Sequence, residues 1–183
     1  MNLLATDIAG VMVARTKVLQ DHRGAFARLF CEEELALALG HRRIVQINQS
    51  RTTATGAVRG LHFQYAPHAE MKMVRCLKGK VWDVAVDLRK KSPTFLHWHA
   101  LELSAANAQM LIIPEGCAHG FQVLESDAEL LYLHTANYAH NAEGGLRFDD
   151  PALGISWPLS VTEVSERDKA HSFIDSNFQG LSV

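Results

Sequence analysis

The feature that most constrains the fold of this chain is a series of short apolar runs separated by turn-forming residues. The runs recur from Val11 to His134, and most of them alternate between apolar and polar side chains. Such alternation is typical of strands that bury one face, and many short strands with turns between them form a sandwich or a barrel. We therefore expect an all-β fold, with strands at 11–19, 43–48, 57–64, 72–77, 80–88, 95–103, 110–113, 120–124 and 128–134.

Glycine residues mark the expected breaks between these elements. Gly79 predicts a turn, and the runs 72–77 and 80–88 on either side of it form the clearest predicted hairpin. Residues 32–39 are expected to form a short helix that ends at Gly40, and another helix is expected near the C-terminus. We see no internal repeat, low-complexity tract or linker, so we expect a single domain over residues 1–183.

The composition excludes several classes of protein. With 183 residues, 48% of them apolar, the chain can form a domain-sized core. Its formal net charge of −2 argues against nonspecific binding of nucleic acid. It has neither a signal-peptide pattern nor the ~18 uninterrupted apolar residues of a membrane span. Three cysteines without CxxC spacing (Cys31, Cys76 and Cys117) favour a reducing compartment, so we expect a cytoplasmic protein without a membrane partner.

Two segments resemble the paired metal-binding motifs of the cupin superfamily. In the first, His62 keeps a ligand position, but Gln64 and Lys72 replace the second histidine and the acid. In the second, residues 114–119 match Pro-x-Gly-x-x-His, but Val123 holds the last ligand position. A lysine ammonium repels a cation and valine has no donor atom. The resemblance therefore implies a cupin-type jelly roll (double-stranded β-helix) with a few short helices, without a metal in this site and without a cofactor.

His97 and His99 form another His-x-His pattern. Both side chains would lie on one face of a strand, where they could bind a metal. No third ligand is near them in the sequence, so we interpret them as surface or edge histidines.

Short segments from about Val11 to Asp168 form an ordered series over nearly the whole chain. They include 59–64 (Arg-Gly-Leu-His-Phe-Gln), 72–76, 83–89, 92–95, 102–105, 113–121, 131–132, 148–151, 154–158 and 165–168. This series resembles the dTDP-4-dehydrorhamnose 3,5-epimerase family, whose substrate is a nucleotide-linked 4-keto-6-deoxyhexose. The C–H bonds at C3 and C5 of such a sugar are acidic because both carbons adjoin the C4 carbonyl. Epimerisation needs a base, an acid across the ring and a group that holds the enolate oxygen.

The resemblance implies a catalytic set of four residues. His62 would be the base, and Asp168 would orient it. Lys72 would stabilise the enolate at C4, and Tyr132 would protonate the far face of the ring. Each also has a structural interpretation: Lys72 as an edge-strand lysine, Tyr132 as a core tyrosine, and Asp168 as part of the Ser-x-x-Asp start of a helix at Ser165.

The resemblance also implies a set of substrate contacts and a dimeric partner. Arginine suits the diphosphate because its guanidinium makes bidentate contacts. The implied contacts are Arg23, Phe26, Gln46, Asn48, Arg59, His119, Tyr138, Glu143 and Arg167. The family is dimeric, and the segment around Arg23 would cross into the site of the partner subunit.

The chain departs from the family at substrate-contacting positions. Arg28, which we include among the substrate contacts, stands where the family usually has an acid. Residues 46–49 read Gln-Ile-Asn-Gln where the family usually reads Gln-Asp-Asn-His. Because charge reversal changes which groups can bind, these changes are consistent with a different base, a different sugar or epimerisation at one carbon only.

Three other functions stay open at this point. A related ketoisomerase would move the carbonyl between C3 and C4, although the presence of both Lys72 and Tyr132 favours epimerisation. A metal-dependent cupin oxygenase would need bound iron. A sugar-nucleotide binder without activity would leave the acid–base set unexplained.

Overall fold

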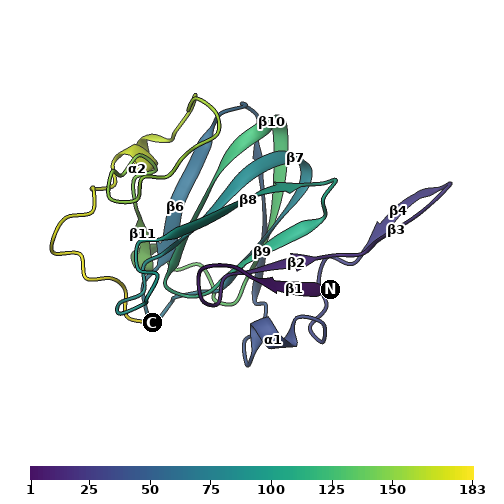
Figure 1. Ribbon diagram of the computed structural model, residues 1–183, viewed down its shortest axis with the longest axis horizontal. Helices are drawn as coiled ribbons and strands as arrows, with labels where there is room; N and C mark the ends of the chain where they lie inside the picture. The colour runs from purple at the N-terminus through teal and green to yellow at the C-terminus, as the bar shows by residue number, and fades with distance from the viewer.

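Strands are the main regular element of the computed structural model, which describes residues 1–183 (Figure 1). The strands are β1 (Asn2–Ala5), β2 (Met12–Arg15), β3 (Val18–Asp21), β4 (Gly24–Ala27), β5 (Gln46–Thr52), β6 (Val58–Gln64), β7 (Lys72–Asp87), β8 (Trp98–Ser104), β9 (Gln109–Ile113), β10 (Cys117–His134) and β11 (Glu143–Gly145). The helices are α1 (Ala36–Leu39), the 3-10 helix η1 (His140–Ala142) and α2 (Glu166–Lys169). No helix has the length and apolar character needed to cross a membrane.

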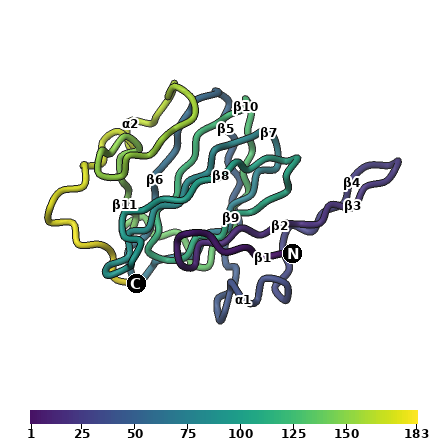
Figure 2. The backbone as a smooth tube through the Cα atoms, viewed as in Figure 1, coloured from purple at the N-terminus to yellow at the C-terminus, as the bar shows by residue number.

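Two long strands, β7 and β10, organise the barrel. They pair with each other in antiparallel fashion along most of their length. The first part of β7 pairs with β9 and the second part with β8, while β10 pairs first with β6 and then with β5. Each long strand thus changes its outer neighbour part-way along, and the sheet curves around a core (Figure 2). The prediction of a cupin-type jelly roll with a few short helices is confirmed.

The predicted hairpin at Gly79 is wrong. Gly79 has φ +72° and lies inside β7, so the runs before and after it are one strand. The predicted strands 120–124 and 128–134 likewise belong to β10, and the register between β7 and β10 shifts between Glu125 and Glu129. A glycine with positive φ accommodates a bulge as readily as a turn, so the sequence signal does not separate the two. The predicted helix 32–39 is also shorter in the structure, because only residues 36–39 are α-helical.

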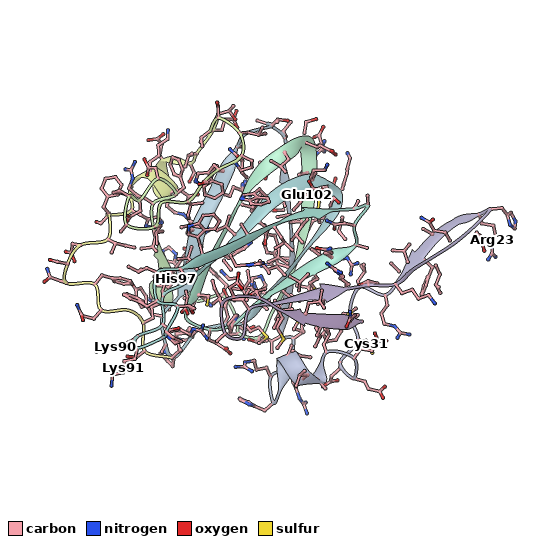
Figure 3. All side chains as sticks on the ribbon, viewed as in Figure 1. Arg23, Cys31, Lys90, Lys91, His97 and Glu102 are labelled. Atoms are coloured by element: carbon pink, nitrogen blue, oxygen red, sulfur yellow. The ribbon has the colours of Figure 1, made fainter.

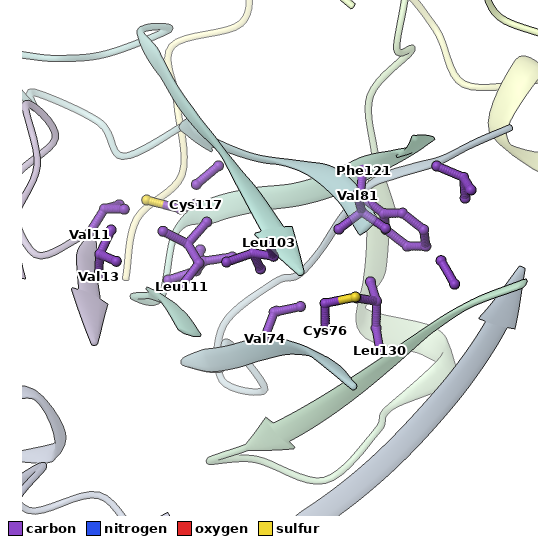
Figure 4. Close-up of a cluster of buried hydrophobic side chains, with 14 of the residues drawn as sticks. Val11, Val13, Val74, Cys76, Val81, Leu103, Leu111, Cys117, Phe121 and Leu130 are labelled. Carbon is purple, nitrogen blue, oxygen red and sulfur yellow. The ribbon is translucent and has the colours of Figure 1, made fainter. Parts of the chain in front are cut away.

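Apolar side chains from β7, β8, β9 and β10 fill the barrel (Figure 4). The cluster includes Val81, Leu103, Phe121 and Leu130, all of them 2% exposed or less. Full burial of a side chain of this size contributes about 1.5–3 kcal/mol. Tyr132 packs against this cluster, so the core holds one wall of the site described below.

The hairpin of β3 and β4 extends away from the barrel (Figure 1), and Arg23 lies at its tip (Figure 3). Its apolar side chains are unusually open to solvent, with Leu19 54% and Phe26 68% exposed. On the opposite side of the barrel, the C-terminal segment with α2 runs beside β6 and β11 (Figure 2). This segment carries Asp168 to β6.

Candidate active site

A cavity of about 340 Å³ is bounded by β5, β6, β10 and the start of β7, with β11 and α2 at its margin. It is lined by most of the predicted site residues, namely Gln46, Asn48, Arg59, His62, Lys72, His119, Tyr132, Tyr138, Glu143 and Arg167. A wider groove of about 1080 Å³ adjoins it and contains Asp168. Because His62 lines both spaces, the predicted residues come together around this side chain.

His62 and Asp168 are in direct contact although they are 106 residues apart in the sequence. His62 Nε2, on β6, lies 2.8 Å from Asp168 Oδ1, on α2. The Asp168 side chain is 3% exposed, whereas that of His62 is 25% exposed. The fold therefore buries the carboxylate behind an imidazole that is open to the cavity.

Two backbone groups hold Asp168 in this position. Its own N–H donates to Ser165 Oγ (3.1 Å), which caps the start of α2. The N–H of Gly60 donates to Asp168 Oδ2 (3.1 Å). The Ser-x-x-Asp pattern therefore does begin a helix, and that helix aims the carboxylate at His62. The helix-start role and the pairing with His62 occur in the same structure.

The charge of Asp168 decides which nitrogen of His62 carries the ring hydrogen. Burial opposes ionisation, but the hydrogen bonds from His62 and Gly60 hold the pKa of Asp168 at about 2. An ionised carboxylate only accepts hydrogen bonds, so Nε2 of His62 must be the donor. The lone pair of neutral His62 is then on Nδ1. Arg167 Nη2 lies 3.2 Å from the same Nε2, but it cannot donate to an atom that already carries hydrogen.

Lys72 lies across the cavity within a charged network. Its Nζ lies 3.2 Å from Glu70 Oε1 and donates to the backbone oxygen of His62 (3.3 Å). Glu70 Oε2 is in turn 2.8 Å from His134 Nδ1. Burial disfavours the ionised form of Glu70, but its contacts with His134 and Lys72 lower its pKa. The ammonium is therefore fixed in the cavity by a carboxylate beside it.

Tyr132 and His119 form another wall of the cavity. Tyr132 shares a hydrogen bond of 3.0 Å with Ser50 Oγ, and burial raises the pKa of Tyr132. His119 Nε2 contacts Oδ1 of Asp83 at 2.8 Å, and its ring packs edge-on against Tyr132. Asp83 is fully buried, which raises its pKa, and its Oδ2 has no hydrogen-bond partner. Because burial raises the pKa of Tyr132, its phenol keeps its proton at neutral pH.

The cavity margin carries groups suited to an anion and an aromatic base. Arg59 is exposed and makes no ion pair. Arg167 Nη1 and the Tyr138 hydroxyl both contact Glu143 Oε2 at 3.1 Å. The ring of Tyr138 is exposed, and its backbone N–H donates to Gln46 Oε1 (3.0 Å). Asn48 Nδ2 lies 3.3 Å from His134 Nε2.

The remaining predicted contacts do not join the cavity of their own chain. Arg23 pairs with Asp21 at 2.6 Å, and Phe26 lies on the same exposed hairpin. Arg28 pairs with Glu34 beyond the end of β4. These residues line neither the cavity nor the adjoining groove.

The cupin metal positions do not fit a metal in this chain. Gln64 uses its amide to bind the backbone of His68 and Ala139. Lys72 brings a cationic group to the next position, and Val123 is fully buried in the core. The His-x-His pattern does not provide a substitute, since His97 is exposed, His99 is half-buried, and neither belongs to a group of three donors.

Sequence reasoning missed several polar residues next to the predicted set. Glu70 and His134 support Lys72, and Asp83 supports His119. His171 lies close to His62 and Asp168. A signal existed for His134, which alternates with Tyr132 on one strand. For Glu70 and His171 the sequence offers none, because both lie in irregular segments placed by tertiary packing.

Comparison with known proteins identifies the family of this chain. The sequence model of the dTDP-4-dehydrorhamnose 3,5-epimerase family matches residues 5–176. A protein of that name from Shigella flexneri is 41% identical over 180 residues, which are 97% of this chain and 99% of the relative.

Solved structures give the same result. A dTDP-6-deoxy-D-glucose-3,5-epimerase from Legionella pneumophila, in complex with dTDP-4-keto-L-rhamnose, has a TM-score of 0.91 and 36% identity over 100% of this chain and 98% of that chain. A 3'-monoepimerase from Streptomyces bikiniensis, in complex with dTDP-quinovose, has a TM-score of 0.86 and 32% identity over 92% and 85%. With this extent of similarity in sequence and structure, the chain belongs to the dTDP-4-dehydrorhamnose 3,5-epimerase family.

Proposed function

We propose that this chain epimerises a dTDP-linked 4-keto-6-deoxyhexose at C3 and C5. The observation that carries the proposal is the arrangement of His62, Lys72 and Tyr132 around one cavity, with Asp168 bonded to His62. A base, a cation and a proton donor are the three groups that the reaction needs. The similar enzyme from Legionella pneumophila has dTDP-4-keto-L-rhamnose bound, which supports the substrate class.

The base in this proposal is Nδ1 of His62. It removes the proton from the carbon beside the ketone, and the electron pair of the C–H bond moves into the enolate. Asp168 stabilises the resulting imidazolium through Nε2. A positioned base of this kind contributes roughly 10²–10⁴-fold to the rate.

Lys72 supplies the positive charge for the enolate oxygen. Its ammonium is held by Glu70 and by the backbone oxygen of His62, so it needs little reorganisation when charge develops. Removing a fixed electrostatic group of this kind typically costs roughly 10²–10³-fold in kcat.

Tyr132 returns a proton to the opposite face of the carbon. Its raised pKa keeps the phenol protonated until the enolate is formed. The tyrosinate left behind is a strong base and regains a proton from solvent, with Ser50 as its hydrogen-bonding neighbour. The imidazolium of His62 releases its proton to solvent, which completes the balance.

We propose that Arg59 and Arg167 bind the diphosphate and that Tyr138 stacks on the nucleotide base. Arg59 has no anionic partner of its own, which leaves its guanidinium free for a phosphate. The exposed ring of Tyr138 lies beside Arg167 through their common contact with Glu143.

We also propose a homodimer in which each hairpin of β3 and β4 completes the site of the partner subunit. Phe26 and Leu19 are exposed on a two-stranded element that extends from the barrel. An isolated hairpin of this kind is only marginally stable in water. Packing against a second copy would bury these side chains and bring Arg23 and Arg28 to a substrate.

The stereochemistry of the product tests the proposed reaction. The purified protein is incubated with dTDP-4-keto-6-deoxy-D-glucose and EDTA, and the product is followed by proton NMR. We expect inversion at both C3 and C5. Inversion at C3 alone would identify a monoepimerase, as in the similar Streptomyces bikiniensis enzyme, and a 3-keto product would identify a ketoisomerase.

A further inference from the structure

His171 lies beside the His62–Asp168 pair and takes no part in the reaction proposed above. Its ring centroid is 6.3 Å from that of His62, at an interplanar angle of 67°. One donor atom from each of His62, Asp168 and His171 lies within 4.8 Å of the other two. Nε2 of His171 is buried and has no hydrogen-bond partner, so this imidazole has a nitrogen that no other group uses.

Gly145 makes the space for this third group. It lies on β11 directly opposite His62 on β6. A Cβ atom at residue 145 would lie 2.2 Å from His171 Nε2 and within 2.7 Å of two carbon atoms of the same ring. The imidazole of His171 therefore occupies a place that exists only because residue 145 has no side chain.

We propose that His62, Asp168 and His171 bind a divalent transition-metal ion of the Zn²⁺ class and that this ion inhibits the enzyme. Two imidazoles and one carboxylate suit such ions, and three protein donors leave a position open to water. At bond lengths of about 2.0–2.1 Å, donors around a tetrahedral ion lie about 3.3 Å apart. The three ligand atoms already lie within 4.8 Å of one another, so the proposed binding requires the side chains to move closer together.

Inhibition follows because the ion binds a nitrogen of His62, the proposed base. Binding to Nε2 of His62 displaces the ring hydrogen to Nδ1, the atom that acts as the base. The ion also separates His62 from the Asp168 carboxylate. This consequence rests on the proposed role of His62, whereas binding of the ion does not.

Arg167 places a positive charge beside the proposed ion, which weakens metal binding. Its Nε lies 3.7 Å from Asp168 Oδ1, and its Nη2 lies 3.2 Å from His62 Nε2. A guanidinium this close repels a cation. The side chain is 56% exposed, so it can turn into solvent when the ion binds, although it then loses its ion pair with Glu143. Removing its charge should therefore tighten metal binding.

The visible absorption of Co²⁺, a spectroscopic substitute for Zn²⁺, tests binding without substrate. Metal-free protein is titrated with Co²⁺, and Zn²⁺ is then added to displace it. We expect one equivalent of Co²⁺ with the bands of a low-coordinate site. His171→Asn should weaken binding at least about 10-fold, Gly145→Ala should weaken it by displacing the ring, and Arg167→Gln should strengthen it. The exposed His41 provides the matched control, so His41→Asn should bind as the wild type does.

Inhibition is measured separately, with each variant compared with its own metal-free rate. Zn²⁺ should inhibit the wild type and the His41→Asn variant at concentrations at least about 10-fold lower than it inhibits the His171→Asn variant. The proposal is overturned if the wild type gives no low-coordinate Co²⁺ spectrum, or if His171→Asn and the wild type bind and respond alike. The Co²⁺ titration uses no substrate. If the protein showed no epimerase activity, the proposed function would be wrong, but the Co²⁺ spectrum would still test the metal site.

Discussion

The chemistry of the site depends at the residue scale on where His62 carries its hydrogen. The pKa of Asp168 is held at about 2, so its carboxylate fixes the hydrogen on Nε2 throughout the neutral range. Glu70 fixes Lys72 in a similar way on the other side of the cavity. In both cases a buried acid positions a group that we propose acts on the substrate.

Replacing Asp168 by asparagine tests the first of these arrangements. The amide can donate to Nε2, which would move the ring hydrogen to Nδ1 and block the base. We expect kcat to fall by about 10²–10⁴-fold, with a small change in KM. Asp149→Asn, at an exposed carboxylate outside both cavities, is the control for steady-state kinetics. A variant of Asp168 with the kcat of the wild type would contradict the proposed pairing.

Replacing Lys72 by methionine tests the enolate contact. The change keeps a side chain of similar length and removes the charge, so kcat should fall by roughly 10²–10³-fold. Lys78→Met, an exposed lysine of the same strand, should leave kcat unchanged. Equal rates for the two variants in the same assay would mean that Lys72 does not act on the reaction.

Site residues that lie in recognisable sequence motifs could be predicted, whereas those in irregular segments could not. His62, Lys72 and His119 lie in strand motifs, so the resemblance places them at recognisable positions. Tyr132 and Asp168 follow from the same ordered series. Glu70 and His171 belong to irregular segments, and their contacts depend on how those segments pack across the barrel. No local pattern encodes that packing.

Strand register positions the site at the scale of elements. The pairing of β6 with β10 sets His62 opposite His119, and the pairing with β11 sets it opposite Gly145. The alternation of apolar residues predicts the strands well. Their continuity through Gly79 was not predictable, because a bulge and a turn use the same residue.

Asp87 offers a pH test at the end of β7. It accepts hydrogen bonds from Arg89, Ser92 and Thr94, and so closes the turn toward β8. Burial would raise its pKa, but these hydrogen bonds lower it to about 2. A lowered pKa gives stability that is present above the unfolded value near 3.8 and is lost as the pH falls toward 2.

The Asp87→Asn variant should therefore have a lower Tm than the wild type at pH 7. The difference in Tm should shrink between pH 4 and pH 2, where the wild type loses the ionised carboxylate. Thermal unfolding followed by circular dichroism at each pH measures the effect. A difference in Tm that stays constant over this range would show that the charge of Asp87 adds nothing to stability.

At the scale of the whole molecule, the hairpin of β3 and β4 is the element that the proposed dimer depends on. Two predicted substrate contacts, Arg23 and Phe26, lie on it, and Arg28 follows directly after β4; all three are outside the cavity of their own chain. The residues alone do not predict that it extends from the barrel, and only the family resemblance implies that it crosses to a partner subunit, which we propose is a second copy of this chain. A two-fold dimer would supply these contacts to both sites equally.

Mixing two impaired variants tests the shared site. In a two-fold dimer of His62→Asn with Arg23→Ala, one site carries both changes and the other carries neither. Equal amounts of the two variants, unfolded and refolded together, should therefore regain about a quarter of wild-type activity. Each variant refolded alone is the control. No gain in activity, although mass spectrometry finds mixed dimers, would place Arg23 in the site of its own subunit.

Solvent deuterium labelling tests the central claim most directly. The metal-free enzyme is incubated in deuterated water with dTDP-4-keto-6-deoxy-D-glucose, and label at each carbon is followed by NMR and mass spectrometry. The proposed mechanism predicts deuterium at C3 and C5 in the wild type and a loss of at least about 10²-fold in both labelling rates in the His62→Asn variant. Labelling at undiminished rates in that variant, or a product without label at either carbon, would contradict proton abstraction by His62.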